Sequence, residues 1–400
     1  MTLFELKSLY SRFLSGHGDV LHFSAHSHHF WPDVSREAQL QYWDDCALLS
    51  DQKWEKIFSE VIPKAQQHVA RMLALTDPKQ VVFAPNTHEL TSRLLSLFVG
   101  SPGLRILTTS SEFHSWSRQI KRLKELPAVA VDTVDTSGFL TGRQQVLAQL
   151  KDRLATKYDL FFISQVFYDS GLALTDQELL DLKTAAHPET LMVVDGYHGF
   201  AALPSDLSLL EGKVFYLGGG YKYAQAGEGT GFMVVPKGNW RPVYTGWYAE
   251  HNSLSNPSSF EVSYAPDAMA FMGATQDPSG LYRFNAVWDQ FRKLNLGVPQ
   301  IHQTIRRNQL EFLGNLPESF TRSWKLTPLF DRDLSWHGHF LTFEAPTPEA
   351  AQACLEKLRE ARVLVDRRGA RLRFGFGLYQ NQSDVRLLND RLKNVAKSSQ

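Results

Sequence analysis

The sequence predicts an α/β fold with a large, mainly parallel sheet and a smaller α+β domain near the C-terminus. Between residues 80 and 235, short β-like runs alternate with helical stretches, and several of the runs are apolar throughout. Strands of that kind are typical of a parallel sheet covered by helices on both faces. Beyond about residue 240 the composition shifts to Pro, Gly, Ser and Tyr. At 43% hydrophobic and 21% charged residues, the chain is ordinary globular protein, which excludes disorder.

The N-terminal part begins with the strand-like run Val20–Phe23 and continues as a helical region over residues 35–72, where apolar side chains recur at three- and four-residue spacing. The β-like runs that follow are Gln80–Phe83, Arg105–Thr108, Ala128–Val131, Leu160–Ser164, Leu191–Val194, Val214–Leu217 and Phe232–Val235. The helical stretches between them are Glu89–Phe98, Ser117–Leu126, Gln144–Leu154 and Asp176–Ala186. Ligands of such sheets bind beyond the carboxyl ends of the strands, so the loops after these runs hold the candidate site.

After residue 240 the sequence predicts a long ordered loop over residues 241–280 and a helix over about 281–315. The last part is predicted to contain strands at His339–Phe343, Val363–Asp366 and Arg371–Phe376, with helices at Pro348–Ala361 and at the C-terminal end. A chain of 400 residues is long enough for two or three domains.

Charge and cysteine content restrict the classes of partner. Lys plus Arg and Asp plus Glu each number 42, so the chain has no basic surface excess for nucleic acid or an anionic membrane. Its two cysteines, Cys46 and Cys354, fit a reducing compartment. The N-terminus has no signal-peptide layout, and the apolar runs are too short to span a bilayer. We therefore expect a soluble cytoplasmic protein.

Two polar tracts follow neighbouring strands of the predicted sheet. The run Leu191–Val194 leads directly to Asp195 and His198, and the run Val214–Leu217 leads to Gly218-Gly-Gly-Tyr-Lys222. A Walker phosphate loop needs a different spacing and a Ser or Thr after its Lys, so that motif is excluded. A lysine in a glycine-rich loop after a strand, beside a strand-end carboxylate, is a candidate Schiff-base lysine.

These tracts carry a resemblance. Asp195-x-x-His198 and Gly-Tyr-Lys222-Tyr resemble fold type I pyridoxal 5′-phosphate (PLP) enzymes of the class V aminotransferase group, and GGGYKYAQAGEG is similar to kynureninase. The likeness extends from about residue 21 to the end. It implies a large PLP-binding domain (51–280), a small C-terminal α+β domain (281–400), and an N-terminal segment (1–50) that lines the substrate pocket and joins the small domain. It also implies a homodimer with shared active sites.

The resemblance assigns the catalytic and cofactor-binding residues. It implies that Asp195 holds the proton on the pyridine nitrogen and that Lys222 binds the cofactor and moves the substrate proton. Tyr221 matches a tyrosine that contacts the phosphate and serves in proton transfer, and His198 is placed near the phenolate side of the ring. The remaining cofactor-binding positions implied are Thr87, His88, Phe113 (stacking on the ring), Gln165, Trp247 and Thr275, the last two near the dimer interface.

The implied substrate-binding residues are Arg373, His26, His28 and Trp116. Arg373 lies in an alternating strand with Arg371 on the same face, and its planar guanidinium suits a substrate α-carboxylate, with Arg371 as the fallback. Trp116 stands where kynureninases carry an acidic residue, and the segment from His26 to Pro32 also departs from their pattern.

Several functions stay open at this stage. The resemblance implies hydrolytic Cβ–Cγ cleavage of an amino acid, with transamination or β-elimination at the same site as alternatives. Cysteine desulfuration is disfavoured because Cys354 lies in a helical run and Cys46 in the N-terminal helix. A cofactor-binding protein without activity is a third possibility. A different class is a metal-dependent hydrolase, suggested by His26-Ser-His28-His29 after a strand, although we predict no metal ligand in the PLP interpretation.

Overall fold

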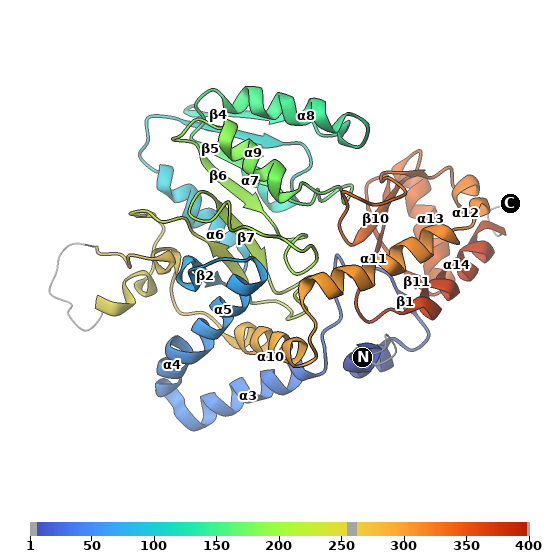
Figure 1. Ribbon diagram of the computed structural model, residues 1–400, viewed down its shortest axis with the longest axis horizontal. Helices are drawn as coiled ribbons and strands as arrows, with labels where there is room; N and C mark the ends of the chain where they lie inside the picture. The colour runs from blue at the N-terminus through green and yellow to red at the C-terminus, as the bar shows by residue number, and fades with distance from the viewer. Residues whose placement is uncertain (1–5, 254–261, 398–400) are drawn as a thin grey trace.

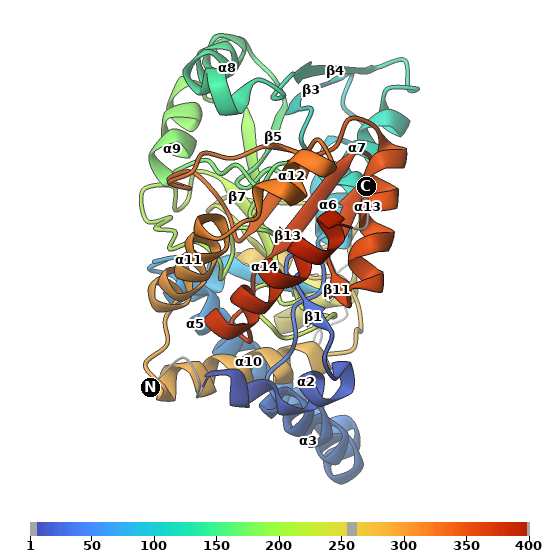
Figure 2. The same ribbon diagram turned by 90° about the vertical axis from the view of Figure 1, so that its right-hand side faces the viewer.

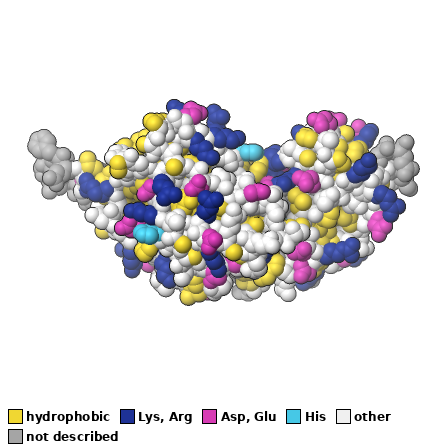
Figure 3. Space-filling model, turned by 90° about the horizontal axis from the view of Figure 1, so that it is seen from above, with side chains coloured by type: hydrophobic (Ala, Val, Ile, Leu, Met, Phe, Trp, Pro, Cys, Tyr) yellow, Lys and Arg dark blue, Asp and Glu magenta, His cyan; other side chains and the backbone are white. Residues whose placement is uncertain are grey.

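The computed structural model describes residues 6–253 and 262–397 of the chain. It confirms the predicted α/β architecture, with a large lobe built on a mainly parallel sheet and a small lobe near the C-terminus (Figure 1). The surface is hollowed between the two lobes (Figure 3).

The large sheet has seven strands in the order β2-β8-β7-β6-β5-β3-β4. Their bounds are Val81–Ala84 (β2), Leu104–Thr109 (β3), Val129–Val134 (β4), Leu160–Ser164 (β5), Leu191–Asp195 (β6), Phe215–Gly219 (β7) and Gly231–Val234 (β8). Strands β3 to β7 pair in parallel, whereas β8 is antiparallel to both of its neighbours, β2 and β7. The carboxyl ends of β2, β3, β5, β6 and β7 therefore meet at one edge.

Helices cover this sheet on both sides. In Figure 2, α8 (Phe139–Leu154) and α9 (Asp176–Ala185) lie to one side of the strands, and α6 (Thr87–Leu95) and α7 (His114–Leu123) to the other. The remaining helices of this lobe are α3 (Val34–Leu49), α4 (Lys53–Lys56), α5 (Ile62–Met72) and α10 (Ser279–Lys293).

Two regions predicted as single helices are interrupted. The region 35–72 breaks at Ser50, which has a positive φ of 49°, and contains a π-helical turn at Ile57–Val61. The region 281–315 divides into α10 and α11 (Val298–Gly314) at Asn295, whose φ is 54°. Part of the predicted loop over 241–280 lies outside the described residues; the rest includes short 3-10 turns at Trp247–Ser253 and Ala268–Phe271.

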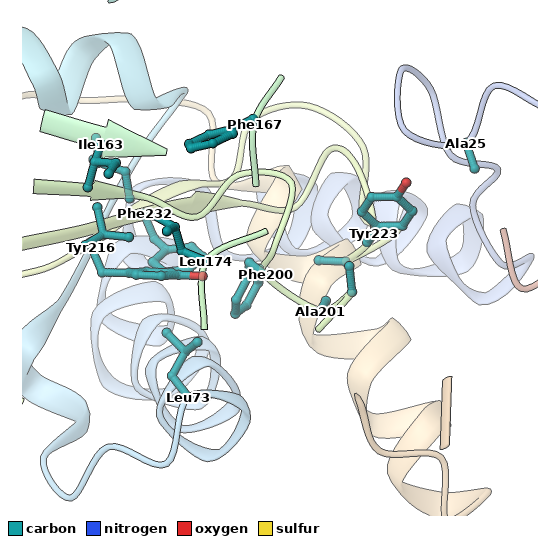
Figure 4. Packing of buried hydrophobic residues seen from close by; sticks show 14 of the residues in the cluster. Ala25, Leu73, Ile163, Phe167, Leu174, Phe200, Ala201, Tyr216, Tyr223 and Phe232 are labelled. Carbon is teal, nitrogen blue, oxygen red and sulfur yellow. The ribbon is translucent and has the colours of Figure 1, made fainter. Parts of the chain in front are cut away.

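The core of the large lobe lies between the sheet and its helices. All residues of β2, β5, β7 and β8 are buried, which agrees with their apolar sequences. Figure 4 shows Ile163 and Tyr216 projecting from their strands, with Phe200 and Phe232 packed beside them. The rings of Phe200 and Phe232 meet edge to face with centroids 4.6 Å apart. This packing fixes the strand ends on which the site is built.

The small lobe contains a four-stranded antiparallel sheet in the order β12-β13-β10-β9. Its strands are Thr327–Pro328 (β9), Phe340–Glu344 (β10), Asp366–Arg368 (β12) and Arg371–Gly375 (β13), and its helices are α12 (Glu318–Ser323), α13 (Pro348–Glu360) and α14 (Gln382–Lys397). The N-terminal segment contributes helix α2 (Ser11–His17) and strand β1 (Leu21–His22), which pairs in parallel with β11 (Val363–Leu364). Residues 21–22 are thereby joined to the small lobe.

The packing of α10 bears on how the lobes divide. This helix packs on α3 and α5 of the large lobe, whereas α11 runs toward the small lobe (Figure 1). The segment boundaries at residues 50 and 280 stay a prediction. Within residues 6–253 and 262–397, no helix is both long and apolar enough to cross a membrane.

Candidate active site

A cavity of about 290 Å³ opens at the edge where the parallel strands end. Its walls come from the loops after β2, β3, β5, β6 and β7, as the parallel arrangement predicts. Seven of the predicted cofactor and catalytic residues line it: Thr87, His88, Phe113, Asp195, His198, Tyr221 and Lys222. Residues separated by more than 130 positions are thus brought into one pocket.

Lys222 is a buried amine in the centre of this group. Its Nζ lies 2.5 Å from Nε2 of His198, and 5.5 Å from the centre of the Phe113 ring. Burial, followed by the positive charge of Arg373, lowers the pKa of Lys222 to about 7. Burial also lowers the pKa of His198 well below its usual value, so His198 is a neutral acceptor for the Lys222 amine. An amine with this pKa is able to take up and release a proton near neutrality.

Asp195 lies at the tip of β6, at the buried end of the cavity. Its Oδ1 accepts a hydrogen bond from the backbone N–H of Tyr197 at 2.9 Å. Burial raises the pKa of Asp195, while the Tyr197 N–H and the charge of Lys222 oppose that rise. A cationic partner in the cavity would favour the ionised carboxylate.

A second buried carboxyl group, Glu112, was not predicted. Glu112 precedes Phe113, and its oxygens accept hydrogen bonds from the Thr109 hydroxyl at 2.6 Å and the Ser164 hydroxyl at 2.5 Å. Burial raises its pKa to about 8, the charge of Asp195 adds to that rise, and the hydroxyl donors partly offset it. Glu112 could have been found from the sequence, because it directly precedes Phe113 in the loop that follows a strand.

The N-terminus of α6 forms the opposite wall. Asn86 caps the helix by accepting a hydrogen bond from the Glu89 N–H at 3.0 Å, which leaves the first N–H groups of the helix at the cavity. Helix N-termini of this kind bind phosphate groups. A Cβ at Gly231 of β8 would lie 2.5 Å from the Asn86 carbonyl carbon, so glycine there allows the close approach of β8 to this helix start.

Two of the glycines before Lys222 lie against aromatic rings. A Cβ on Gly218 would lie 2.4 Å from the Phe232 ring, and one on Gly219 would lie 2.6 Å from the Tyr197 ring. The missing side chains make room for these two aromatic rings rather than for a bound ligand. The rings in turn fix the loop that carries Lys222.

Arg373 and His26 lie behind the cavity wall, in the small lobe and the N-terminal segment. Arg373 is 2% exposed, and its Nη1 donates to the carbonyl of Tyr168, a cavity residue, at 2.7 Å. His26 is also buried and stacks on Phe340 with ring centres 4.7 Å apart. Burial lowers the pKa of His26 to about 3, so its ring is neutral. Arg371, the fallback, instead pairs with Asp169 and Glu344.

His28 and the pair Trp247–Thr275 lie further out. His28 Nδ1 is 3.4 Å from the Tyr221 hydroxyl, so it adjoins a cavity residue without lining the cavity itself. The indole N–H of Trp247 donates to the Thr275 hydroxyl at 3.3 Å, and both residues are exposed. Neither of them lines the cavity.

Two predicted residues have contacts elsewhere. The Gln165 side chain donates to Ser205 and accepts from the Tyr216 hydroxyl, and it lines a separate cavity. The indole N–H of Trp116 donates to Thr108 at 2.9 Å. The Trp116 ring stacks on Phe162 with centres 3.9 Å apart and is 4% exposed. The structure therefore packs Trp116 on the sheet and does not bring it to the cavity.

The histidine run does not form a metal centre. His26 stacks on Phe340, His28 approaches Tyr221, and His29 bonds the Phe30 carbonyl. Across the described ranges, 6–253 and 262–397, no three His, Cys, Asp or Glu side chains are grouped to hold a metal ion.

The donor set of the cavity fits PLP. A buried carboxylate at one end suits a ring nitrogen, a buried lysine suits an aldehyde, and a helix N-terminus suits a phosphate. Residues 21–321 match the family described as Aminotransferase class-V. The chain belongs to the class V aminotransferase family. This class V protein is a PLP-dependent enzyme, as the resemblance implied.

Among characterised proteins, the class V chain is similar to isopenicillin N epimerase of Streptomyces clavuligerus, with 27% identity over 198 residues. That match covers 48% of this chain and 48% of the epimerase, so it spans about half the length of that protein.

Solved structures share the class V fold over nearly the whole chain. A C-DES mutant with glycine covalently linked to its PLP cofactor has a TM-score of 0.80, 17% identity and 98% coverage of both chains. The cystine C–S lyase C-DES with its product cysteine persulfide has a TM-score of 0.77 and 17% identity, covering 96% of this chain and 99% of the other. The apo cysteine desulfurase of Thermococcus onnurineus NA1 has a TM-score of 0.79, 16% identity and 98% coverage of both chains.

Proposed function

We propose that this protein is a PLP-dependent lyase that eliminates a leaving group from Cβ of an amino acid, with sulfur as the leaving atom. The observation that carries the proposal is the pair formed by Lys222 and His198, a buried base and its neutral acceptor, in a cavity without a thiol. Support for the sulfur chemistry comes from the shared fold with the cystine C–S lyase. Transamination at this site is the alternative within the class V family.

In this proposal the chain supplies a proton acceptor, a carboxylate and an anion-binding helix. When bound, PLP stabilises negative charge at the substrate Cα. Lys222 Nζ takes the Cα proton, the Cβ–S bond breaks, and its electron pair leaves with sulfur. Hydrolysis of the remaining three-carbon fragment gives pyruvate and ammonium. Asp195 holds the proton on the ring nitrogen, and Arg373 binds the substrate α-carboxylate.

The positions of the cysteines separate this lyase from an enzyme that keeps the sulfur. Cys354 is buried in α13, and burial raises the pKa of its thiol to about 12. Cys46 lies in α3. Neither of these two cysteines, which are all that the chain has, lines the cavity. A thiol at Cys354 is a poor nucleophile, because the thiolate is the reactive form. Sulfur is therefore expected to leave with a small product.

Kynureninase-like hydrolysis is the second candidate. It is favoured by the tract GGGYKYAQAGEG around Lys222. It adds water across the Cβ–Cγ bond of an amino acid with a γ-carbonyl, so the products are alanine and a carboxylic acid.

The products decide between these reactions. Holoenzyme is incubated with L-cystine, with S-benzyl-L-cysteine and with a 3-acyl-L-alanine, and pyruvate, ammonium and alanine are measured. The lyase releases pyruvate and ammonium in equal amounts from a sulfur substrate, and the matched Lys222→Ala variant releases neither. Alanine from the acyl substrate without pyruvate from the others would establish the hydrolase instead. A keto acid that appears without ammonium would indicate transamination.

A further inference from the structure

Both terminal nitrogens of Arg373 already have acceptors within the protein. Arg373 lies on β13, where Nη1 donates to the Tyr168 carbonyl and Nη2 forms an ion pair with Asp366. Its guanidinium also lies over the Tyr168 ring, 4.7 Å from the centre. The Nε of Arg373 is buried without an acceptor among the described residues, so a second carboxylate that forks onto Nε and Nη2 shares Nη2 with Asp366.

Asp366 lies directly opposite Arg373 in the antiparallel pair β12–β13. Its Oδ1 accepts from Nη1 of Arg368 at 2.8 Å and from the Arg367 N–H at 2.7 Å. Its Oδ2 faces Arg373, and it lies 3.4 Å from Nε2 of His26. The two oxygens thus have separate partners. Oδ1 accepts hydrogen bonds from residues of β12, whereas Oδ2 contacts Arg373 and His26.

We propose that Asp366 and the substrate carboxylate are alternative partners of Arg373, so that Asp366 sets how tightly the site selects a carboxylate. The inference rests on the proposed function, in which Arg373 binds the α-carboxylate. An incoming carboxylate replaces Oδ2 on Nη2 of Arg373. Asp366 stays attached through Oδ1 to Arg368.

The charges explain why one carboxylate takes the place of the other. A buried guanidinium without a counter-ion is costly, so Arg373 needs one carboxylate at all times. Burial raises the pKa of Asp366, but the contact with His26 and the charge of Arg373 lower it by more, so the net pKa lies below its usual value. Asp366 is therefore an anion at neutral pH. Two anions on one Nη2 repel each other, so substrate binding displaces the first.

Propionate, a carboxylate without an amino group, is the probe for this exchange. Its dissociation constant is measured by calorimetry on the holoenzyme of the wild type, Asp366→Asn and Arg373→Lys. Asp366→Asn removes the competing charge with little change in shape, so propionate should bind at least about tenfold more tightly. Arg373→Lys should weaken propionate binding at least about tenfold, because lysine cannot present a planar fork of two N–H groups. The matched control is Asp169→Asn. It removes the carboxylate that pairs with Arg371, which lies on the same strand as Arg373, and it should change the dissociation constant of propionate less than about twofold.

The outcomes separate the inference from the function on which it rests. If Asp366→Asn leaves propionate binding unchanged or weaker while Arg373→Lys abolishes it, the exchange is wrong and the carboxylate role of Arg373 stands. If Arg373→Lys has no effect, the carboxylate role fails, and the exchange fails with it.

A second measurement applies should Asp366→Asn not fold. In crystals of the wild-type holoenzyme soaked with propionate, Oδ2 of Asp366 should have left Arg373 while Oδ1 remains on Arg368. Propionate bound beside an intact Asp366–Arg373 pair would overturn the exchange.

Discussion

At the residue scale, two carboxyl groups share the buried end of the site and differ in their partners. Asp195 faces the cavity with one oxygen held by the Tyr197 N–H. Glu112 does not line the cavity, and its two oxygens bond the hydroxyls of Thr109 and Ser164. Different environments of this kind assign different protonation states to chemically similar groups.

The first prediction concerns Asp195. Asp195→Asn should keep PLP bound, because the helix start at Asn86 and the amine of Lys222 are unchanged. Its turnover should fall by about 100-fold or more, since an amide cannot hold a proton on the ring nitrogen. Cofactor content is measured by absorbance and by borohydride fixation on Lys222, and turnover by pyruvate release. Near-normal turnover would remove Asp195 from its proposed role.

The second prediction concerns Glu112 and pH. Its pKa of about 8 in the folded protein exceeds the usual value of a glutamate, so the folded state holds a proton that the unfolded state releases. The contribution of Glu112 to stability should fall as pH rises from about 4.5 to about 8 and level off above that, whereas buried histidines such as His26, whose pKa is lowered, add stability as pH rises toward about 6.5. Glu112→Gln removes this slope, so its free energy of unfolding relative to the wild type should increase over the same window.

Urea unfolding of the apoprotein at several pH values measures that slope, and the exposed Glu55→Gln in α4 is the control. A slope that persists unchanged in Glu112→Gln would mean that Glu112 is already ionised in the folded state.

At the scale of elements, the strand ends were predictable and the side-chain directions beside them were not. The run Leu160–Ser164 is β5 as predicted, and β6 extends its predicted run by one residue, to Asp195. Short runs that are apolar throughout are typical of strands in a parallel sheet that is covered on both faces. By contrast, the break at Ser50 lacks the Gly or Pro that marks most turns. The break at Asn295 is followed by Gly297 and Pro299, so a turn signal was present there that periodicity alone passed over.

Gln165 and Trp116 show why part of the site escaped prediction. Both follow strands at the correct edge, yet their side chains bond Ser205 and Thr108. Which way a loop side chain turns depends on partners far away in sequence, and these appear only once the chain is packed. The position of Asp366 could have been predicted in part, because a hairpin with its turn at Gly369 places Asp366 opposite Arg373.

The third prediction follows from the packing of Trp116 on β3 and β5. Trp116→Phe retains a ring against Phe162 but loses the hydrogen bond to Thr108, so stability should fall by about 1–2 kcal/mol. The Michaelis constant should not change, because the ring does not reach the cavity. Thermal unfolding and steady-state kinetics measure the two effects. A raised Michaelis constant at unchanged stability would restore Trp116 to a substrate contact.

At the scale of the whole molecule, four of the exposed apolar side chains lie in one connection. Val243, Tyr244, Trp247 and Val262 are each at least 49% exposed and lie in the long connection between β8 and α10. Exposed apolar groups in such numbers are typical of a protein interface. This arrangement supports the predicted homodimer with Trp247 and Thr275 at its contact.

The fourth prediction tests that assembly. Light scattering should give twice the chain mass of 45.4 kDa, and Trp247→Asp should lower both the dimer fraction and the activity. Leu209→Asp, an equally exposed residue in the connection before β7, should lower neither. A fully active wild-type monomer would contradict shared active sites.

The pairing of β1 with β11 has a consequence for synthesis on the ribosome. Leu21 and His22 find their strand partners only at Val363 and Leu364, and Lys7 finds its ion-pair partner only at Asp384. At 5–20 residues per second, the emerging N-terminal segment waits on the order of 20 to 70 s for them. A nascent chain stalled before residue 363 can complete the large sheet and its lysine, yet it lacks β11, Asp366 and Arg373. The contacts of His26 and Arg373 behind the cavity wall are thus the last to form, and a chaperone that shields the first strand would act over that interval.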